Sequence, residues 1–294
     1  MAPANSAKRL TFALATNCGM SKKLENLMFV RELGVGAGTK VSLMRDAKDG
    51  KMYCKKYVAA SAPNWESQVR QLKNEFDVGV HNNHPVLRKS WEYGIIKRKL
   101  RAVEAYNVLG YVDGIQLDKF AESADIPLLI KVFWHCSDGL LDLHKRGFVH
   151  ADLKPHNILC AKSGRPTIID FGQACAMFTK KERIQGTKDF IAKEQVERQI
   201  LDARTDVFGL GATMHKIFLG VSVETELNSA AGSAGHINLD RWRNPTNDQP
   251  RQIDPTLLKL IEDCCQPDRM NRPESMQIVK DRLEVTFDKI AKTA

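Results

Sequence analysis

Apolar and polar positions follow one periodicity in the first part of the chain and another in the second. Alternating apolar residues predict mainly strands at first, at residues 27–33, 41–45, 51–58, 90–96 and 102–111. A single helix is predicted among them, at 65–80. Beyond residue 114 the apolar spacing predicts helices at 127–144, 193–199, 205–218, 255–265 and 275–291. Two short strands are predicted within this helical region, at 158–160 and 167–170.

The change of pattern divides the chain into three parts. Residues 1–26 are small, polar or basic and form an expected N-terminal extension. Residues 27–112 make up a β-rich unit and residues 113–294 a helical one, joined near 110–114. Residues 221–254, rich in Asn, Gly, Ser and Pro, predict a long loop. We therefore expect an α+β fold of two lobes, with a cleft between them as a natural place for a ligand.

Composition narrows the class of protein. The length of 294 residues, with 43% hydrophobic and 27% charged residues, is typical of a globular chain. No apolar run approaches the roughly 18 residues that span a bilayer, so we expect no membrane partner. The run Leu10–Ala15 is shorter than the apolar core of a secretory signal peptide.

The cysteines indicate the cellular compartment of the protein, and the net charge indicates the kind of partner that it binds. None of the seven cysteines lies in a C-x-x-C pair, and Cys264 and Cys265 are adjacent, which favours free thiols. We expect a reducing compartment: the cytoplasm, the nucleus or a host cell into which the protein is delivered. The net charge of +9 comes from short, scattered clusters without interleaved aromatic residues. This favours a basic surface around an anionic-ligand site, and we do not expect nucleic acid.

The strongest motif is the string His150-Ala151-Asp152-Leu153-Lys154-Pro155-His156-Asn157, followed by Ile168-Ile169-Asp170-Phe171-Gly172. Asp152 offers a carboxylate that can accept a hydroxyl proton, and Lys154 can neutralise developing phosphate charge. Asn157 and Asp170 offer hard oxygen ligands that suit Mg²⁺ bridging phosphates. These residues resemble the catalytic and metal-binding loops of the eukaryotic-type (Hanks-type) serine/threonine protein kinases.

The resemblance covers roughly residues 27–291 and implies the bilobal kinase fold. That fold has a small β-rich N-lobe with one helix and a larger α-helical C-lobe. The implied activity is transfer of the γ-phosphate of ATP to a Ser or Thr hydroxyl of a protein substrate, with Mg²⁺, or alternatively Mn²⁺, as the metal. The implied catalytic residues are Asp152, Lys154, Asn157 and Thr187, and the implied metal ligands are Asn157 and Asp170.

The resemblance also implies a nucleotide site. Its residues are Leu33, Gly34, Gly36, Gly38, Val41, Cys54, Lys56, Glu75, Leu109, Gly110, Val112, Leu159 and Asp170. The glycine-rich loop departs from the family pattern, because Gly38 comes one place early and Thr39 stands where the third glycine is expected. Lys56 competes with Lys55 for the phosphate-binding role, and strand alternation favours Lys56 because it shares a face with Cys54.

Within the implied site, Glu75 pairs with Lys56 and Leu109 is the gatekeeper at the back of the adenine pocket. The backbone of Gly110 and Val112 faces the adenine. Leu33, Val41 and Leu159 enclose its ring. Outside the site, the resemblance assigns structural roles to three residues. Glu194 pairs with Arg272, and Asp206 anchors the catalytic loop.

Two departures from the family pattern lead to hypotheses about regulation. Ala151 replaces the arginine that usually precedes the catalytic aspartate, as in the non-RD kinases, and that arginine normally binds a phosphate on the activation segment. We therefore expect activity that does not depend on phosphorylation there. Gly79 stands four residues after Glu75, where the family places an apolar side chain. Either Val78 or Val80 fills the gap, or the helix needs an activating protein partner.

Two other functional classes remain open. Kinase-like small-molecule phosphotransferases share the His-x-Asp pattern with an Asn five residues after the Asp. They generally lack the protein-substrate platform suggested here by residues 186–194 and Arg272. A kinase-fold scaffold without activity usually loses the lysine or one of the aspartates, whereas this chain keeps Lys56, Asp152 and Asp170.

Overall fold

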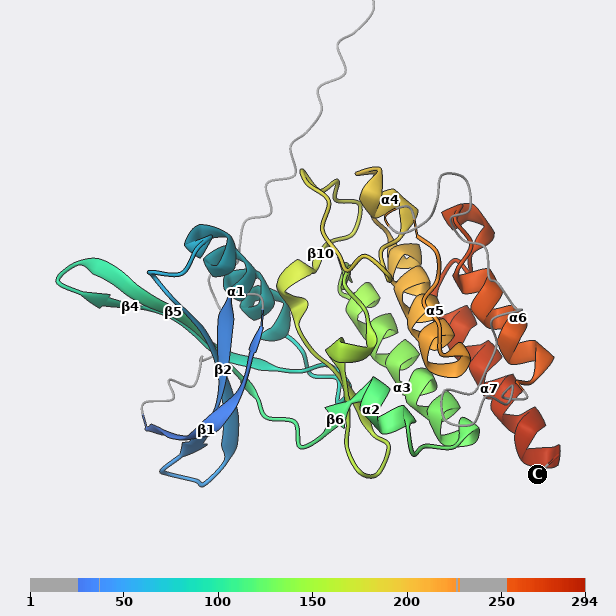
Figure 1. Ribbon diagram of the computed structural model, residues 1–294, viewed down its shortest axis with the longest axis horizontal. Coiled ribbons are helices and arrows are strands. Elements are labelled where there is room, and N and C mark those ends of the chain that lie inside the picture. The colour runs from blue at the N-terminus through green and yellow to red at the C-terminus, as the bar shows by residue number, and fades with distance from the viewer. Residues whose placement is uncertain (1–25, 37, 226, 228–252, 294) are drawn as a thin grey trace, which may run out of the picture.

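The computed structural model describes residues 26–36, 38–225, 227 and 253–293. It has two lobes: a twisted sheet carrying one helix, and a larger body made mainly of helices (Figure 1). The predicted α+β, bilobal class is therefore confirmed. Residues 1–25 of the expected extension and most of the predicted loop 221–254 lie outside the described residues.

The N-lobe is a five-stranded antiparallel sheet with the strand order β1-β2-β3-β5-β4. Its strands are β1 (Leu27–Gly36), β2 (Thr39–Asp46), β3 (Met52–Ala59), β4 (Ser90–Arg98) and β5 (Arg101–Gly110). Helix α1 (Trp65–Gly79) packs on the sheet through Leu72, which joins Val58 and Ala105 in a small apolar cluster. The sheet thus presents β3 to the helix, and this contact sets the relation between Lys56 and Glu75.

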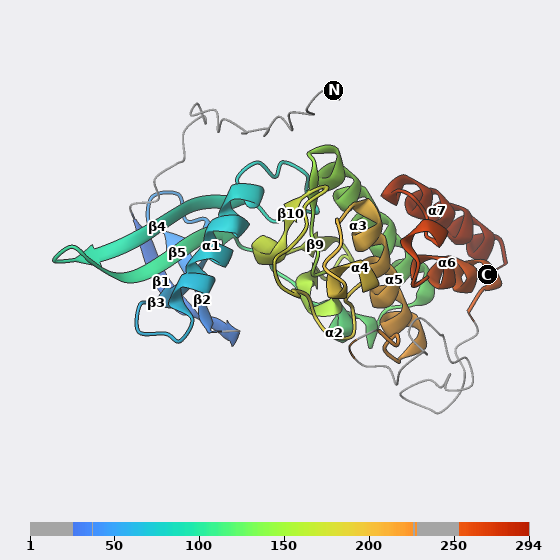
Figure 2. The ribbon, with the colours of Figure 1, turned by 90° about the horizontal axis from the view of Figure 1, so that it is seen from above.

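The β4–β5 hairpin is longer than the alternation predicts. It continues past the end of β3, which last pairs Ala59 with Glu104, and projects away from the body in both views (Figures 1 and 2). The turn at Lys99 and Leu100 has positive φ at both residues. Such a turn matches the twist of a two-residue hairpin. The sequence does not predict this turn, since neither residue is a Gly, Asn or Asp.

The C-lobe contains the helices α2 (Leu117–Ala121), α3 (Ile126–Lys145), α4 (Lys193–Val196), α5 (Ala203–Leu219), α6 (Pro255–Cys264) and α7 (Met276–Thr293). Its short strands are β6 (Ile115–Gln116), β7 (Phe148–Val149), β8 (Ile158–Cys160), β9 (Pro166–Ile168) and β10 (Cys175–Ala176). Local signals explain where α3, α5 and α6 begin, because Asp125, Asp202 and Asp254 each cap one of these helices by accepting a backbone N–H.

The main core lies where α3 and α5 pack together. The rings of Phe133 and Phe218 lie 5.5 Å apart there, and both side chains are almost fully buried. The core continues to Phe171 beneath the N-lobe, so the site loops rest directly on packed apolar side chains. None of the helices in the described part of the chain has the length and apolar character that a membrane crossing requires.

Two differences from the predicted elements have simple causes. The helix predicted at 193–199 is only the single turn α4, after which Arg198 adopts a positive φ and ends it. Helix α2 and strands β6, β7 and β10 were not predicted, because segments of two to five residues are too short to show a period.

Candidate active site

A cavity of about 570 Å³ lies between the two lobes. Its lining includes most of the predicted nucleotide residues, namely Leu33, Gly34, Gly36, Val41, Cys54, Lys56, Val112, Leu159 and Asp170, together with Lys154 and Asn157. Gly38 and Gly110 are not among the residues that line it, and the Gly110 N–H donates to the carbonyl of Lys89 at 2.9 Å. Leu109 is 1% exposed. The volume is in the range of small-molecule sites.

The glycine-rich turn between β1 and β2 forms one wall. Gly38 has φ +87°, a conformation that favours glycine, and the Thr39 hydroxyl donates to the carbonyl of Gly36 at 2.9 Å. The early glycine therefore sits inside the turn, and Thr39 closes it. A Cβ added to Gly34 or Gly36 would meet nothing within 4 Å, so the backbone borders open space into which an anionic group fits.

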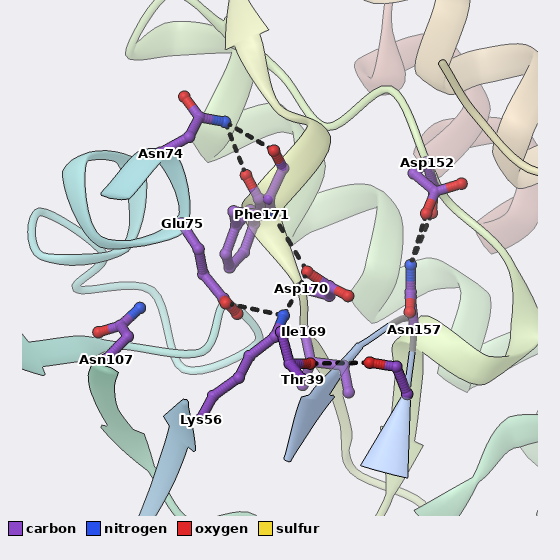
Figure 3. Close-up of polar contacts among 12 residues, drawn as sticks. Thr39, Lys56, Asn74, Glu75, Asn107, Asp152, Asn157, Ile169, Asp170 and Phe171 are labelled. Carbon is purple, nitrogen blue, oxygen red and sulfur yellow. Dashed lines mark hydrogen bonds and ion pairs between the residues drawn. The ribbon is translucent and has the colours of Figure 1, made fainter. Parts of the chain in front are cut away.

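Lys56 enters the site and Lys55 does not, as the alternation along β3 predicts. The Lys56 ammonium donates to Glu75 Oε2 at 3.0 Å and to Asp170 Oδ1 at 2.9 Å (Figure 3). Lys55 instead donates to Glu104 Oε1 at 2.6 Å, from the opposite face of the strand. The alternation argument therefore selected the lysine that meets both predicted carboxylates.

The opposite charges in this cluster stabilise the ionised forms of Lys56 and Asp170. Burial lowers the pKa of Lys56, but Asp170 and Glu75 outweigh burial and raise that pKa well above its usual value. Burial likewise raises the pKa of Asp170, but the charge and hydrogen bond of Lys56 outweigh it and hold this pKa far below the usual range. Both groups therefore remain ionised at neutral pH, as binding of phosphate and of a divalent cation requires.

The metal-binding loop is held in place by a residue that sequence reasoning missed. The Asn74 amide donates to the carbonyls of Phe171 and Gly172 at 3.0 and 3.2 Å (Figure 3), and to that of Ala174 at 2.7 Å. Asp170 itself has φ +66°, a strained conformation for a non-glycine residue. Asn74 directly precedes Glu75 on α1, so one helix fixes both the lysine's partner and the loop that carries Asp170.

Asp152 lies at the centre of a second cluster, on the C-lobe side. The Thr187 hydroxyl donates to Asp152 Oδ1 at 2.7 Å, and the Lys154 ammonium donates to Asp152 Oδ2 at 3.1 Å and to Thr187 Oγ1 at 2.7 Å. The Asn157 amide nitrogen donates to the Asp152 carbonyl at 2.8 Å, so the amide oxygen is its remaining donor atom for a metal (Figure 3). The four predicted catalytic residues are thus together.

The catalytic loop is anchored from below by Asp206 on α5. Its carboxylate accepts the backbone N–H groups of His150 and Ala151 at 2.8 and 2.9 Å, and it contacts His144 Nε2 at 2.8 Å. Burial raises the pKa of Asp206, but the contacts with His144 outweigh it and lower that pKa. The structural role inferred for Asp206 from the resemblance agrees with this geometry.

Glu194 and Arg272 form a buried two-bond ion pair. The Arg272 guanidinium donates to Glu194 Oε1 and Oε2 at 2.8 and 3.0 Å, and it also donates to the carbonyl of Arg204 at 3.1 Å. The pair ties the end of the segment that carries Thr187 to the C-lobe helices. This geometry agrees with the structural role predicted for both residues.

Comparisons with known proteins decide the family. Residues 27–283 match the protein kinase domain family, which is most of the chain. The chain belongs to the protein kinase family. It is 27% identical over 198 residues to serine/threonine-protein kinase PknB of Mycolicibacterium smegmatis, a match spanning 64% of this chain and 31% of that protein.

Two eukaryotic kinases are similar as well. A probable protein kinase of Dictyostelium discoideum is 26% identical over 267 residues, covering 87% of this chain and 72% of that protein. Aurora kinase B of Mus musculus is 25% identical over 201 residues, covering 67% of this chain and 57% of that kinase. The chain spans about a third of the length of PknB, so the kinase domain is what the two share.

Gly79 in this kinase domain has a packing explanation. A Cβ added there would lie 2.3 Å from the Ser90 hydroxyl oxygen, so only glycine allows α1 and β4 to approach so closely. Val78 is 1% exposed and belongs to the same apolar core as Leu87 and Phe171. Of the two valines predicted to fill the gap, Val78 is therefore the one in the core that joins the lobes.

The kinase site fits Mg²⁺ bound together with phosphates. Asp170 and Asn157 both line the cavity and offer oxygen donors. Among the described residues there is no group of three His, Cys, Asp or Glu side chains that could hold a metal by itself. Mg²⁺ commonly binds through one or two protein ligands plus substrate phosphates, so two donors are consistent with this ion.

Cys54 forms part of the apolar wall of the kinase cavity. Its side chain is 5% exposed, and burial raises the pKa of its thiol against the opposing effect of the Arg88 charge. The thiol is therefore protonated at neutral pH and acts as a small apolar group in the cavity wall.

Proposed function

We propose that the protein is an ATP-dependent serine/threonine kinase that transfers the γ-phosphate of Mg-ATP to a Ser or Thr hydroxyl of a protein substrate. The observation that carries the proposal is that two clusters of charged side chains reach one cavity. The cluster of Lys56, Glu75 and Asp170 reaches it through Lys56 and Asp170, and the cluster around Asp152 reaches it through Lys154 and Asn157. The relatives described as serine/threonine kinases support the same acceptor class.

In this reaction the bond between the γ-phosphorus and the ADP oxygen breaks, and a bond to the substrate oxygen forms. Asp152 accepts the proton of the substrate hydroxyl, since its Oδ1 has a second lone pair beside the hydrogen bond from Thr187. Lys154 offsets the negative charge that develops on the transferred group. Asp170 and Asn157 would hold Mg²⁺, which would neutralise phosphate charge when bound.

The protein-substrate platform supports a protein acceptor rather than a small molecule. Thr187 lies in the segment that follows the metal-binding loop, and Glu194 at the end of that segment is locked to Arg272. A scaffold without activity has no need for a lysine and two aspartates held in this geometry. The direct test is transfer of labelled γ-phosphate onto a mixed protein preparation, with phosphoserine and phosphothreonine as the expected products.

We further propose that activity does not depend on phosphorylation of the activation segment. The Gln195 amide donates to the carbonyls of Ala151 and Gln185 at 2.8 and 3.0 Å. Lys181 donates to the carbonyl of Gln173 at 2.5 Å, and Arg183 donates to the Ser67 hydroxyl of α1 at 3.0 Å. These contacts tie the segment down in the unmodified chain.

The expected result is that phosphatase-treated enzyme and the Thr179→Ala variant keep at least half of the wild-type activity. Thr179 is the hydroxyl of this segment that lies away from Asp152, whereas Thr187 contacts it. The measurement is the initial rate of transfer after the unmodified mass has been verified. An unmodified preparation without activity that regains it on phosphorylation would contradict this prediction.

Helix α1 either needs an activating protein partner to reach its active position or reaches that position without one. The contact of Gly79 with Ser90, the burial of Val78 and the three bonds of Asn74 support a self-sufficient helix. We therefore expect turnover by the purified chain to change less than twofold when a cell lysate, first depleted of ATP, is added. A rise of tenfold or more would show that a partner is needed.

A further inference from the structure

A second cation reaches Glu75 from the side opposite Lys56. The Arg88 guanidinium donates to Glu75 Oε1 at 2.8 Å, while Lys56 takes Oε2. The Glu75 side chain is 0% exposed and that of Arg88 is 9% exposed. A carboxylate removed from water in this way is costly unless it is paired, so Arg88 is a principal reason why Glu75 can be buried as an ion.

The backbone of Arg88 is fixed on both sides. Its N–H donates to the carbonyl of Ile168 at 3.0 Å, next to an isolated bridge between Leu87 and Ile168. Its carbonyl accepts the Asn82 amide at 2.8 Å. Arg88 therefore approaches Glu75 from a segment attached to the C-lobe strand that leads into Asp170, and not from α1 or β3.

The surroundings of this pair are polar, although they lie beneath the helix. The Ser90 hydroxyl donates to the Glu75 carbonyl at 3.2 Å, and Asn107 approaches that hydroxyl at 3.4 Å. Arg88 Nε and Asn107 Oδ1 are buried and have no hydrogen-bond partner within the described part of the chain. The network thus holds Arg88 and Glu75 in place by directed contacts rather than by apolar packing.

The charges of the cluster around Lys56 balance only when Arg88 is counted. Lys56 and Arg88 face Glu75 and Asp170, and Arg88 lines the nucleotide cavity together with Lys56. Without Arg88, two carboxylates would share the single Lys56 ammonium. Lys56 would then be held more strongly by them and would be less available to the phosphates of a nucleotide.

We propose that Arg88 is a positioning residue for nucleotide use: it holds Glu75 in a fixed ion pair, so that Lys56 can turn its charge to the phosphates while α1 stays in place. This inference rests on the proposed kinase function. It concerns how the phosphate-binding lysine is kept available, and it is distinct from the Lys56–Glu75 pair that the sequence motif implies.

The test compares Arg88→Met and Arg88→Lys with the matched control Lys55→Met. Lys55 is also an N-lobe cation paired with a glutamate, but its pair lies on the other face of β3. We expect Arg88→Met to raise the KM for ATP about tenfold and to lower kcat, because Lys56 is then shared by two carboxylates. Arg88→Lys should return KM to within about threefold of wild type, and Lys55→Met should leave it unchanged.

A purely structural role would give a different pattern. Partial unfolding reduces the active fraction, which lowers the apparent kcat and leaves KM for ATP unchanged. That result, or an Arg88→Lys variant as impaired as Arg88→Met, would overturn the inference. If Arg88→Met does not fold, Arg88→Gln takes its place, with the same rise of about tenfold in the KM for ATP expected. An unchanged KM for Arg88→Gln would equally overturn the inference.

Binding of a fluorescent ATP analogue with Mg²⁺ separates this inference from the proposed function. Wild-type protein that binds the analogue but transfers no phosphate would refute the kinase proposal. The Arg88 inference would then be decided by the dissociation constant alone, with the same tenfold weakening expected for Arg88→Met and none for Lys55→Met. Equal affinity of wild type and Arg88→Met would refute it.

Discussion

Replacing Asp152 with Asn is expected to lower the rate of phosphate transfer by about 10²–10⁴-fold, the usual contribution of a positioned general base. The substituted amide keeps the shape and can still accept one hydrogen bond from Thr187 or Lys154, but it cannot take the substrate proton. Asp152 does not line the cavity that holds the predicted nucleotide residues. We therefore expect the KM for ATP to change less than threefold.

The rate is measured as transfer of labelled γ-phosphate to a protein mixture at saturating Mg-ATP. Asp142→Asn is the matched control, since Asp142 lies on the same lobe in a partly exposed pair with Arg146 and is remote from the cavity lining. It should transfer phosphate at nearly the wild-type rate. Equal rates for Asp152→Asn and wild type would exclude Asp152 as the base and would remove the main support for the proposed reaction.

The site could be placed from the sequence where spacing and periodicity act together. Alternation along β3 distinguished Lys56 from Lys55, and Glu75 followed from the resemblance, which implies its pairing with Lys56. Asp152 and Asp170 followed from a motif in which many functional residues lie close together in the sequence. Alternation along a strand and a dense local motif can both be recognised without knowing which residues meet in space.

The residues that were missed act across long separations in the chain. Asn74 supports carbonyls about a hundred positions later, and Gln195 reaches back 44 positions to Ala151. Arg88 meets Glu75 only because the segment before β4 is attached to the C-lobe. A single amide or guanidinium in such a place forms no pattern with its neighbours, so periodicity cannot reveal it.

Gly79 illustrates a different limit. The sequence shows that a side chain is missing, but it cannot show what takes its place. In the structure Ser90 occupies the space beside Gly79, and Val78 lies in the apolar core. The missing side chain suggested that α1 is loosely packed. In the structure the neighbouring residues pack so closely that only glycine fits at this position.

Replacing Arg272 with Met is expected to lower the free energy of unfolding by about 3–5 kcal/mol, the largest loss of stability that we predict. The change leaves the Glu194 carboxylate, whose side chain is 3% exposed, without its cationic partner. It also removes the contact between the guanidinium and the ring of Phe208, which lie 4.9 Å apart. The measurement is equilibrium unfolding in urea, followed by far-ultraviolet circular dichroism.

Two further variants show whether the unpaired charge causes that loss. Arg282→Met removes a partly exposed pair with Asp263 and should cost less than about 1 kcal/mol, as surface ion pairs do. The double variant Glu194→Leu/Arg272→Met removes both buried charges and should recover much of the stability lost by Arg272→Met. A double variant less stable than Arg272→Met would show that the bonds of Glu194 to its other neighbours, such as the Thr205 hydroxyl at 2.9 Å, matter more than its charge.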